Sequence, residues 1–150
     1  MNDFYRNNEH YYDPTAGEAL TNISREERRR SSRKPVRAFI CSRLAGNIDH
    51  NLTMAKKYTK FAIDSGYAAF CPHLLYSQVM SDDVSEEREI AIAMGKSFLA
   101  VCSVLLVFME DGMISEGMQS EIDFAKRIRK GIAIRYFDSN CQEVTISDSD

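Results

Sequence analysis

The run VLLVF at residues 104–108 limits the possible folds of this chain more than any other feature. Consecutive branched apolar residues are typical of a central strand that is buried on both faces of a parallel sheet. The run VRAFIC at 36–41 predicts a second such strand. Shorter apolar runs predict strands at 67–70 and 132–137, and residues 144–146 predict a further strand at an edge.

Helical patterns alternate with these strands. Apolar side chains recur at helical spacing over residues 52–62, and Ser65 with Gly66 provides the stop signal. Asp83 with Glu86 three residues later resembles a capping box and predicts the start of a second helix. The apolar positions of this second helix are Ile90, Met94, Phe98 and Val101.

The alternation of strand and helix predicts the fold class. A third helix is expected over residues 116–130 with Gly131 as its C-cap, and residues 74–83 are expected to form a loop. Right-handed crossovers place the helices on both faces of the sheet. We therefore expect a single three-layer α/β domain, Rossmann-like or flavodoxin-like, with four or five mainly parallel strands.

Composition excludes several classes of protein. The 150 residues are 44% hydrophobic and 27% charged, which fits one globular domain. A net charge of −3 gives no overall field that attracts nucleic acid. No apolar run approaches the roughly 20 residues of a membrane span, and the polar start lacks a signal-peptide pattern. We expect a cytoplasmic protein without a membrane partner.

Residues 1–35 differ from the domain expected at 36–150. They are polar, and the stretch REERRRSSRK at 25–34 is strongly basic. Such a stretch is typical of a solvated, partly disordered extension, and it is also compatible with binding RNA or a protein partner. The sequence leaves both interpretations open and favours the first.

Cysteine and histidine positions predict neither a metal site nor a cofactor. The cysteines are Cys41, Cys71, Cys102 and Cys141. Each lies in or beside an apolar segment, there is no CxxC pair, and the histidines do not complete a metal-ligand spacing. Buried, reduced thiols are the expected state.

Three segments are expected to meet at one edge of the sheet. Residues 42–47, 71–78 and 110–121 follow predicted strands, and ligands of parallel α/β sheets bind beyond the carboxyl ends of the strands. In the third segment, Ser115 and Gly117 begin a helix whose free amides can hold an anion such as phosphate. Ser42 and Gly46 offer a second set of donors after the first strand.

Glu121 is the most informative single residue. On a helical projection it falls within the apolar stripe formed by Met118, Ile122 and Ala125, opposite the charged Asp123. An inward carboxylate is unfavourable unless it is paired or put to chemical use. The pattern leaves open a functional role, a bond to backbone or arginine, and an exit to solvent from the edge of the stripe.

Residues 36–136 resemble the nucleoside 2-deoxyribosyltransferase-like superfamily. The resemblance rests on FICS at 39–42, CPHLL at 71–75 and SEGMQSEIDFA at 115–125. It is strongest to the branch with 5-hydroxymethyl-dUMP N-hydrolase, and within it to uncharacterised phage and bacterial members. Members carry a glycine, a glutamate four residues later and an alanine four beyond, which Gly117, Glu121 and Ala125 match.

The resemblance implies a function and roles for individual residues. Glu121 corresponds to the nucleophile that attacks C1′ of a deoxyribose, and Ser115 to the serine that binds a 5′-phosphate. The implied enzyme cleaves an N-glycosidic bond or transfers the deoxyribosyl group of a deoxynucleoside or its 5′-monophosphate. His73, Tyr76 and Asp111 are candidates for protonating the leaving base or contacting the substrate. The superfamily also implies a homo-oligomer whose subunits share active sites.

Two departures from the family pattern keep an alternative open. Gly95 stands where hydrolases of the superfamily carry an aspartate that orients nucleophile and substrate, and Ser103 replaces an acidic residue before the third strand. Residues 86–89 supply acidic side chains that are able to substitute. The alternative is a non-catalytic module that senses or sequesters a nucleotide-derived ligand.

Overall fold

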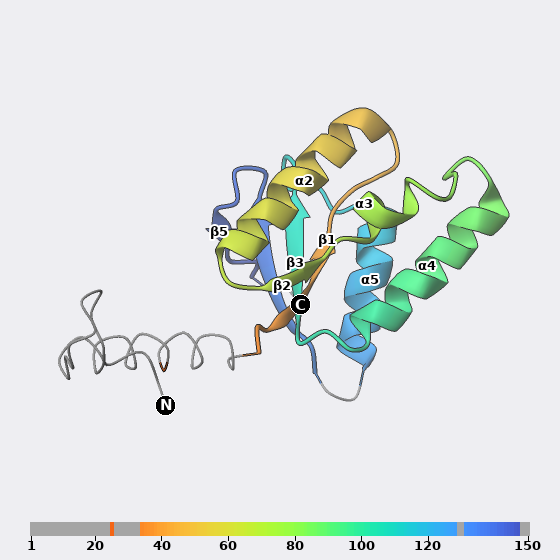
Figure 1. Ribbon diagram of the computed structural model, residues 1–150. Helices are drawn as coiled ribbons and strands as arrows, with labels where there is room; N and C mark the ends of the chain where they lie inside the picture. Colours follow the sequence, from red (N-terminus) through yellow and green to blue (C-terminus); the bar gives the residue numbers. More distant parts are fainter. Residues whose placement is uncertain (1–24, 26–33, 129–130, 148–150) are drawn as a thin grey trace, which may run out of the picture. The chain divides into compact units, whose positions relative to one another are not determined.

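Strands and helices alternate along the chain in the order that the sequence predicts (Figure 1). The computed structural model of the protein describes residue 25, residues 34–128 and residues 131–147. Their elements are β1 (Arg37–Cys41), α2 (Ile48–Asp64), β2 (Ala68–Phe70), α3 (Pro72–Tyr76), α4 (Ser85–Leu99), β3 (Val104–Met109), α5 (Glu116–Arg127), β4 (Ala133–Asp138) and β5 (Glu143–Val144).

The strands form one mainly parallel sheet, which confirms the predicted fold class. In the described part of the chain the sheet has five strands in the order β2-β1-β3-β4-β5. β1 pairs in parallel with β2 and β3, β3 pairs in parallel with β4, and β5 runs antiparallel to β4. Because β1 lies between β2 and β3, the strand order reverses between β1 and β3.

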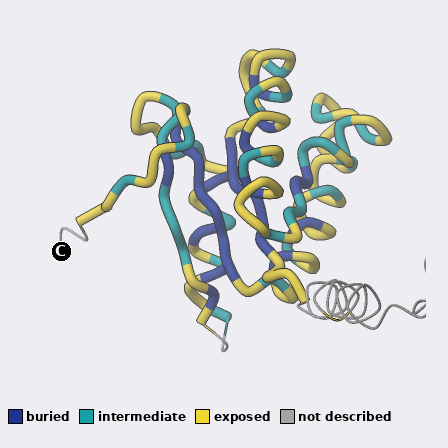
Figure 2. The backbone as a smooth tube through the Cα atoms, turned by 60° about the vertical axis from the view of Figure 1, so that its left-hand side comes forward, coloured by how far each residue is buried: buried dark blue, intermediate teal, exposed yellow. Residues whose placement is uncertain are grey.

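The central strands send alternate side chains into two cores, one on each face of the sheet. Ala38 and Ile40 of β1 pack with residues of α2, such as Tyr58. Phe39 and Cys41 point to the other face, where α4 and α5 lie. β1 and β3 are buried along most of their length (Figure 2), which explains their continuous apolar sequences.

A short helix replaces part of the expected loop at 74–83. α3 spans Pro72–Tyr76, with Pro72 in its first turn. Proline is favoured there because its fixed φ suits a helix and its missing N–H would have no intrahelical partner. The prediction of a loop is therefore wrong at residues 74–76.

The predicted capping box at Asp83 and Glu86 is also wrong. α4 begins at Ser85, and its N-cap residue Val84 makes no side-chain capping hydrogen bond. Glu87 instead accepts a hydrogen bond of 2.6 Å from the backbone N–H of Ser81. That contact ties the α3–α4 loop to the first turn of α4.

α4 buries a different face from the one that the sequence pattern indicates. The predicted apolar positions Ile90, Met94, Phe98 and Val101 are 47%, 45%, 46% and 55% exposed. Gly95 and Leu99 are buried instead. Phe98 stacks on Phe70 with ring centroids 4.5 Å apart. The other predicted apolar positions of this face remain exposed to solvent.

The remaining boundaries differ by a few residues. β2 is shorter than 67–70, and β5 ends before Ile146. α5 ends at Arg127 with Ile128 as its C-cap, so the prediction of a helix to residue 130 with Gly131 as C-cap is wrong, although Gly131 has a positive φ of 59°. The prediction for 1–35 falls almost entirely on residues outside the described part. Within the described residues, no helix has the length and apolarity that crossing a membrane requires.

Candidate functional site

A cavity of about 580 Å³ opens at the carboxyl ends of the strands, beside the point where the strand order reverses. Its walls are the β1–α2 loop, α3, the α3–α4 loop, α4 and the start of α5. Such crevices are the usual ligand sites of open α/β sheets. The cavity brings together six residues singled out from the sequence: Ser42, His73, Tyr76, Ser115, Gly117 and Glu121.

Glu121 lies on α5 and points toward the cavity and the sheet. Its Oε2 atom is buried and has no hydrogen-bond partner among the described residues. Burial raises the pKa of Glu121 from 4.5 to about 7, while a hydrogen bond from the Cys41 thiol and the charge of Lys96 act in the opposite direction. A buried carboxylate oxygen without a partner, on a residue that lines a cavity, marks a candidate functional group.

Cys41 and Ser42 connect Glu121 to the end of β1. Burial and the neighbouring Glu121 raise the pKa of Cys41, so its thiol stays protonated, and its Sγ lies 3.8 Å from the carbonyl oxygen of Met118, to which it donates. Ser42 is 4% exposed, and its Oγ has no hydrogen-bond partner in the described part of the chain. Two buried polar atoms without partners, Ser42 Oγ and Glu121 Oε2, therefore line the same cavity.

The start of α5 offers amide donors to the cavity. Ser115 is the N-cap residue, and its Oγ accepts a hydrogen bond of 3.3 Å from the N–H of Met118. A Cβ added at Gly117 would meet no atom of the described chain within 4 Å. Packing within the described chain does not require glycine there, and the missing side chain leaves the backbone of the first turn of α5 open to the cavity.

His73 lines the cavity with its ring fixed by a backbone bond. Its Nε2 lies 2.7 Å from the carbonyl oxygen of Ser42, so this nitrogen carries the proton and donates it. Burial lowers the pKa of His73, against the opposing effects of that bond and of Asp82. The His73 ring is therefore neutral, and its hydrogen bond to the Ser42 carbonyl oxygen joins α3 to the β1–α2 loop.

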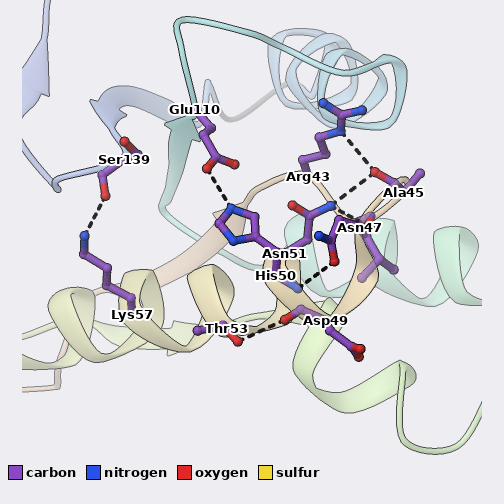
Figure 3. Close-up of polar contacts among 11 residues, drawn as sticks. Arg43, Ala45, Asn47, Asp49, His50, Asn51, Thr53, Lys57, Glu110 and Ser139 are labelled. Atoms are coloured by element: carbon purple, nitrogen blue, oxygen red, sulfur yellow. Dashed lines mark hydrogen bonds and ion pairs between the residues drawn. The ribbon is translucent and has the colours of Figure 1, made fainter.

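A network of polar contacts holds the β1–α2 loop (Figure 3). The Asn51 amide donates to the carbonyl oxygens of Leu44 at 2.8 Å and Ala45 at 3.2 Å, and Arg43 Nε donates to Ala45 at 3.0 Å. Asn47 caps α2 by accepting from the N–H of His50. These contacts fix the loop that begins with Ser42.

A contact between His50, in the first turn of α2, and Glu110, directly after β3, joins these two segments. His50 Nε2 lies 2.7 Å from Glu110 Oε1, and Figure 3 shows the two side chains pointing toward each other. The pair joins α2 to the segment after β3. The loop after β1 and the loop after β3 are thus held together beside the cavity.

Gly46 and Asp111 do not line the cavity. Gly46 has φ of 104°, and an added Cβ would lie 3.3 Å from Arg43 Nη2, so this glycine serves the turn. Asp111 is exposed in the turn that joins Glu110 to Met113. The structure therefore separates these two predicted residues from the other six.

Two residues beside Glu121 were not singled out from the sequence, Cys41 and Lys96. Lys96 lines the cavity on α4, immediately after the buried Gly95. The sequence carries no signal for it, because the burial of Gly95 and Leu99 on the inner face of α4 is evident only in the structure. Of the acidic and basic residues at 86–89, Glu87 and Arg88 line the cavity.

A metal ion in a protein is bound by a cluster of suitable side chains. Within residues 34–128 and 131–147, no cluster of three or more histidine, cysteine or acidic side chains has the geometry to hold an ion. Cys41, Cys71, Cys102 and Cys141 are free thiols, the first two buried and the last two half-buried. Burial raises the pKa of each, which keeps them in the less reactive thiol form.

A family model described as "Domain of unknown function (DUF7768)" matches residues 36–137. The chain belongs to the DUF7768 family. The matched residues include β1 to β3, β4 except for its last residue, and every wall of the cavity. No curated protein matches the sequence.

A solved structure similar to this DUF7768 member is a 2-deoxyribosyltransferase from the psychrotolerant bacterium Bacillus psychrosaccharolyticus. The two share 13% sequence identity with a TM-score of 0.58, over 75% of this chain and 77% of that chain. That enzyme is described as a biocatalyst for the synthesis of antiviral and antitumoral nucleosides. At this identity the likeness establishes the common fold.

Proposed function

We propose that this protein cleaves the N-glycosidic bond of a deoxynucleoside or its 5′-monophosphate, by hydrolysis or by deoxyribosyl transfer, with Glu121 as nucleophile. The observation that carries the proposal is that Glu121 lines the cavity and that its buried Oε2 lacks a partner among the described residues. The fold shared with a 2-deoxyribosyltransferase and the resemblance at 115–125 support it.

The chemistry needs a carboxylate in this position. Cleavage passes through an oxocarbenium-like state at C1′, which a nearby carboxylate stabilises or captures as a glycosyl ester. The electron pair of the C1′–N bond leaves with the base, which takes up a proton. Water, or a second base, then attacks C1′, the ester bond breaks, and Glu121 returns to its carboxylate form.

Other cavity residues have roles that follow from their atoms. Ser42 Oγ, buried and without a partner in the described part, is available to a hydroxyl of the sugar. The amides at Glu116 and Gly117 and the Ser115 hydroxyl face an anionic 5′ group. Tyr76 is the better placed proton donor for the base, because the Nε2 proton of His73 is held by Ser42.

A second candidate function is binding without turnover. Gly95 lines the cavity where the superfamily hydrolases carry an aspartate, so that carboxylate is missing from this wall. A protein that senses or sequesters a nucleotide-derived ligand needs the hydrogen-bond donors of the cavity, but it does not need every acidic side chain that catalysis requires. It would be stabilised by its ligand without changing it.

We also propose that the chain assembles with copies of itself. What supports this is the exposed apolar stripe formed by Ile90, Met94 and Phe98 of α4 and by Val101 just after it. Exposed apolar residues that lie in a row along one helix favour contact with another protein surface. The stripe is on the helix whose other residues line the cavity, so an assembled partner would lie next to the site.

The proposed reaction is tested by incubating the protein with a panel of deoxynucleosides and their 5′-monophosphates and following free base by chromatography. The Glu121→Gln variant keeps the shape of the side chain and removes the nucleophilic charge. Asp123→Asn is the matched control, because Asp123 is exposed on the same helix. We expect wild type and Asp123→Asn to release base and Glu121→Gln to lose at least about 10³-fold in rate.

Three results would separate the candidates. Equal base release by wild type and Glu121→Gln would remove Glu121 from the mechanism. Thermal stabilisation by one nucleotide without base release would favour the binding module. Release of base with transfer to an added acceptor base would distinguish transfer from hydrolysis.

A further inference from the structure

The wall of the cavity formed by α4 carries a cation to which the proposed reaction assigns no role. Lys96 lines the same cavity as Glu121. Its Nζ lies 5.8 Å from the centroid of the Phe124 ring, and Phe124 is three residues after Glu121 on α5. Residues three apart are neighbours on a helix surface, so the ammonium of Lys96 lies on the Glu121 side of α5.

The surroundings of Glu121 contain few charges that are free to act on it. The titratable and charged groups on the elements around it are Cys41 of β1, Cys71 after β2, His73 and Tyr76 of α3, Asp82 and Asp83 of the α3–α4 loop, Glu87, Arg88 and Lys96 of α4, and Glu116 of α5. The two cysteine thiols and the His73 ring are neutral, as their shifted pKa values require.

The charged groups at the rim are already engaged or exposed. Arg88 Nε lies 3.7 Å from Asp82 Oδ1, and Glu87 accepts from the Ser81 N–H. Asp83 is exposed in the α3–α4 loop, and Glu116 is exposed in the first turn of α5. By contrast, none of the ion pairs within the described residues includes Lys96.

We propose that Lys96 is a positioning residue for Glu121, whose ammonium favours the ionised form of that carboxylate inside the cavity. This role of Lys96 rests on the proposed function, because Glu121 can attack C1′ only in its ionised form. Burial removes water from a carboxylate and disfavours its ionised form, whereas a nearby positive charge favours the ionised form. Consistent with this, the charge of Lys96 lowers the pKa of Glu121 against the effect of burial.

Gly95 contributes to the same effect by carrying no charge. A carboxylate at position 95 would stand beside Lys96 on the same wall and neutralise part of its field. The glycine leaves the ammonium as the charged group of this turn of α4. A substrate that expels water from the cavity strengthens the attraction between ammonium and carboxylate, because the local dielectric constant falls.

The test is a direct titration of Glu121 that does not depend on turnover. The full chain is labelled with ¹³C at the glutamate side-chain carboxyl carbon and followed by NMR from pH 4 to 9, with Glu121→Gln assigning the resonance. We expect Lys96→Met, which keeps the apolar stem of the side chain, to raise the Glu121 midpoint by about one pH unit. Lys96→Arg should return it to within a few tenths of the wild-type midpoint.

Matched variants separate this effect from a general loss of charge or of packing. Lys126→Met removes an exposed lysine from α5 and should leave the midpoint unchanged. Lys96→Gln repeats the comparison with a polar side chain. A Lys96→Met midpoint within a few tenths of wild type, or a Lys126→Met midpoint that rises as far, would overturn the proposal.

The kinetic readout tests the link to function separately. If the protein releases base, the acid limb of the kcat/KM pH profile should move to higher pH in Lys96→Met by the same amount as the NMR midpoint. A moved NMR midpoint in a protein without turnover would support the role of Lys96 and contradict the proposed reaction. An unmoved midpoint in an active enzyme would do the opposite.

Discussion

Replacing Glu121 by glutamine should stabilise the folded protein at alkaline pH. The rise of the Glu121 pKa from 4.5 to about 7 means that the folded state binds a proton more tightly than the unfolded state. This contribution is fully present below about pH 4.5 and is lost as pH rises through about 7. Above that range, the wild type carries a buried anion that glutamine does not.

The size of the effect follows from the same pKa values. At about 1.36 kcal/mol per pKa unit, the rise from 4.5 to about 7 corresponds to about 3 kcal/mol in the free energy of unfolding. The difference between Glu121→Gln and wild type should therefore grow by about 3 kcal/mol between pH 4.5 and pH 8.5. Differences between variants are informative because the other titrating groups cancel.

Urea denaturation at a series of pH values measures this difference. With m-values of about 1–3 kcal/mol/M, the midpoints of the two proteins should separate by roughly 1–3 M at pH 8.5. Asp123→Asn, on the exposed face of α5, should stay within about 0.5 kcal/mol of wild type at every pH. A Glu121→Gln difference that does not change with pH would refute the argument that Glu121 is buried at a cost.

Two further predictions concern the core and the assembly. Phe108, stacked between Tyr58 at 4.3 Å and Phe137 at 5.1 Å, is 1% exposed, so Phe108→Ala should cost about 3–5 kcal/mol in denaturation experiments. A loss below about 1 kcal/mol would contradict its place in the core. Met94→Glu should lower the mass found by sedimentation equilibrium, because it places a charge in the exposed stripe of α4. A wild-type chain that is already monomeric at about 100 μM would contradict the proposed assembly.

The central strands could be predicted because they are buried on both faces. Val104–Met109 and Arg37–Cys41 carry continuous apolar runs for that reason, and their burial decides the fold class. The inner face of α4 could not be predicted in the same way. Its sequence has apolar residues on two sides, and packing against α3 and α5 selects the side with Gly95 and Leu99.

The candidate site could be predicted in part, where a residue departs from the pattern around it. Glu121 stood out because a carboxylate on an apolar stripe is exceptional, and the structure places it beside the cavity. Lys96 did not stand out, because a single lysine on a helix is ordinarily solvated. Asp111 was selected by its position after β3, and the turn at Glu110–Met113 directs that segment away from the cavity walls.

The construction of the cavity has a consequence for how the chemistry of this domain can change over evolution. Its walls come from separate loops and helices, whereas the sheet fixes their places through the register of β1 and β3. Position 95 illustrates this independence, because a Cβ there would meet only Pro72 and Phe39, at 3.8 and 3.9 Å. This wall therefore has room for a small side chain at position 95 without a change in the scaffold, and a domain of this fold can change its chemistry by altering a single wall.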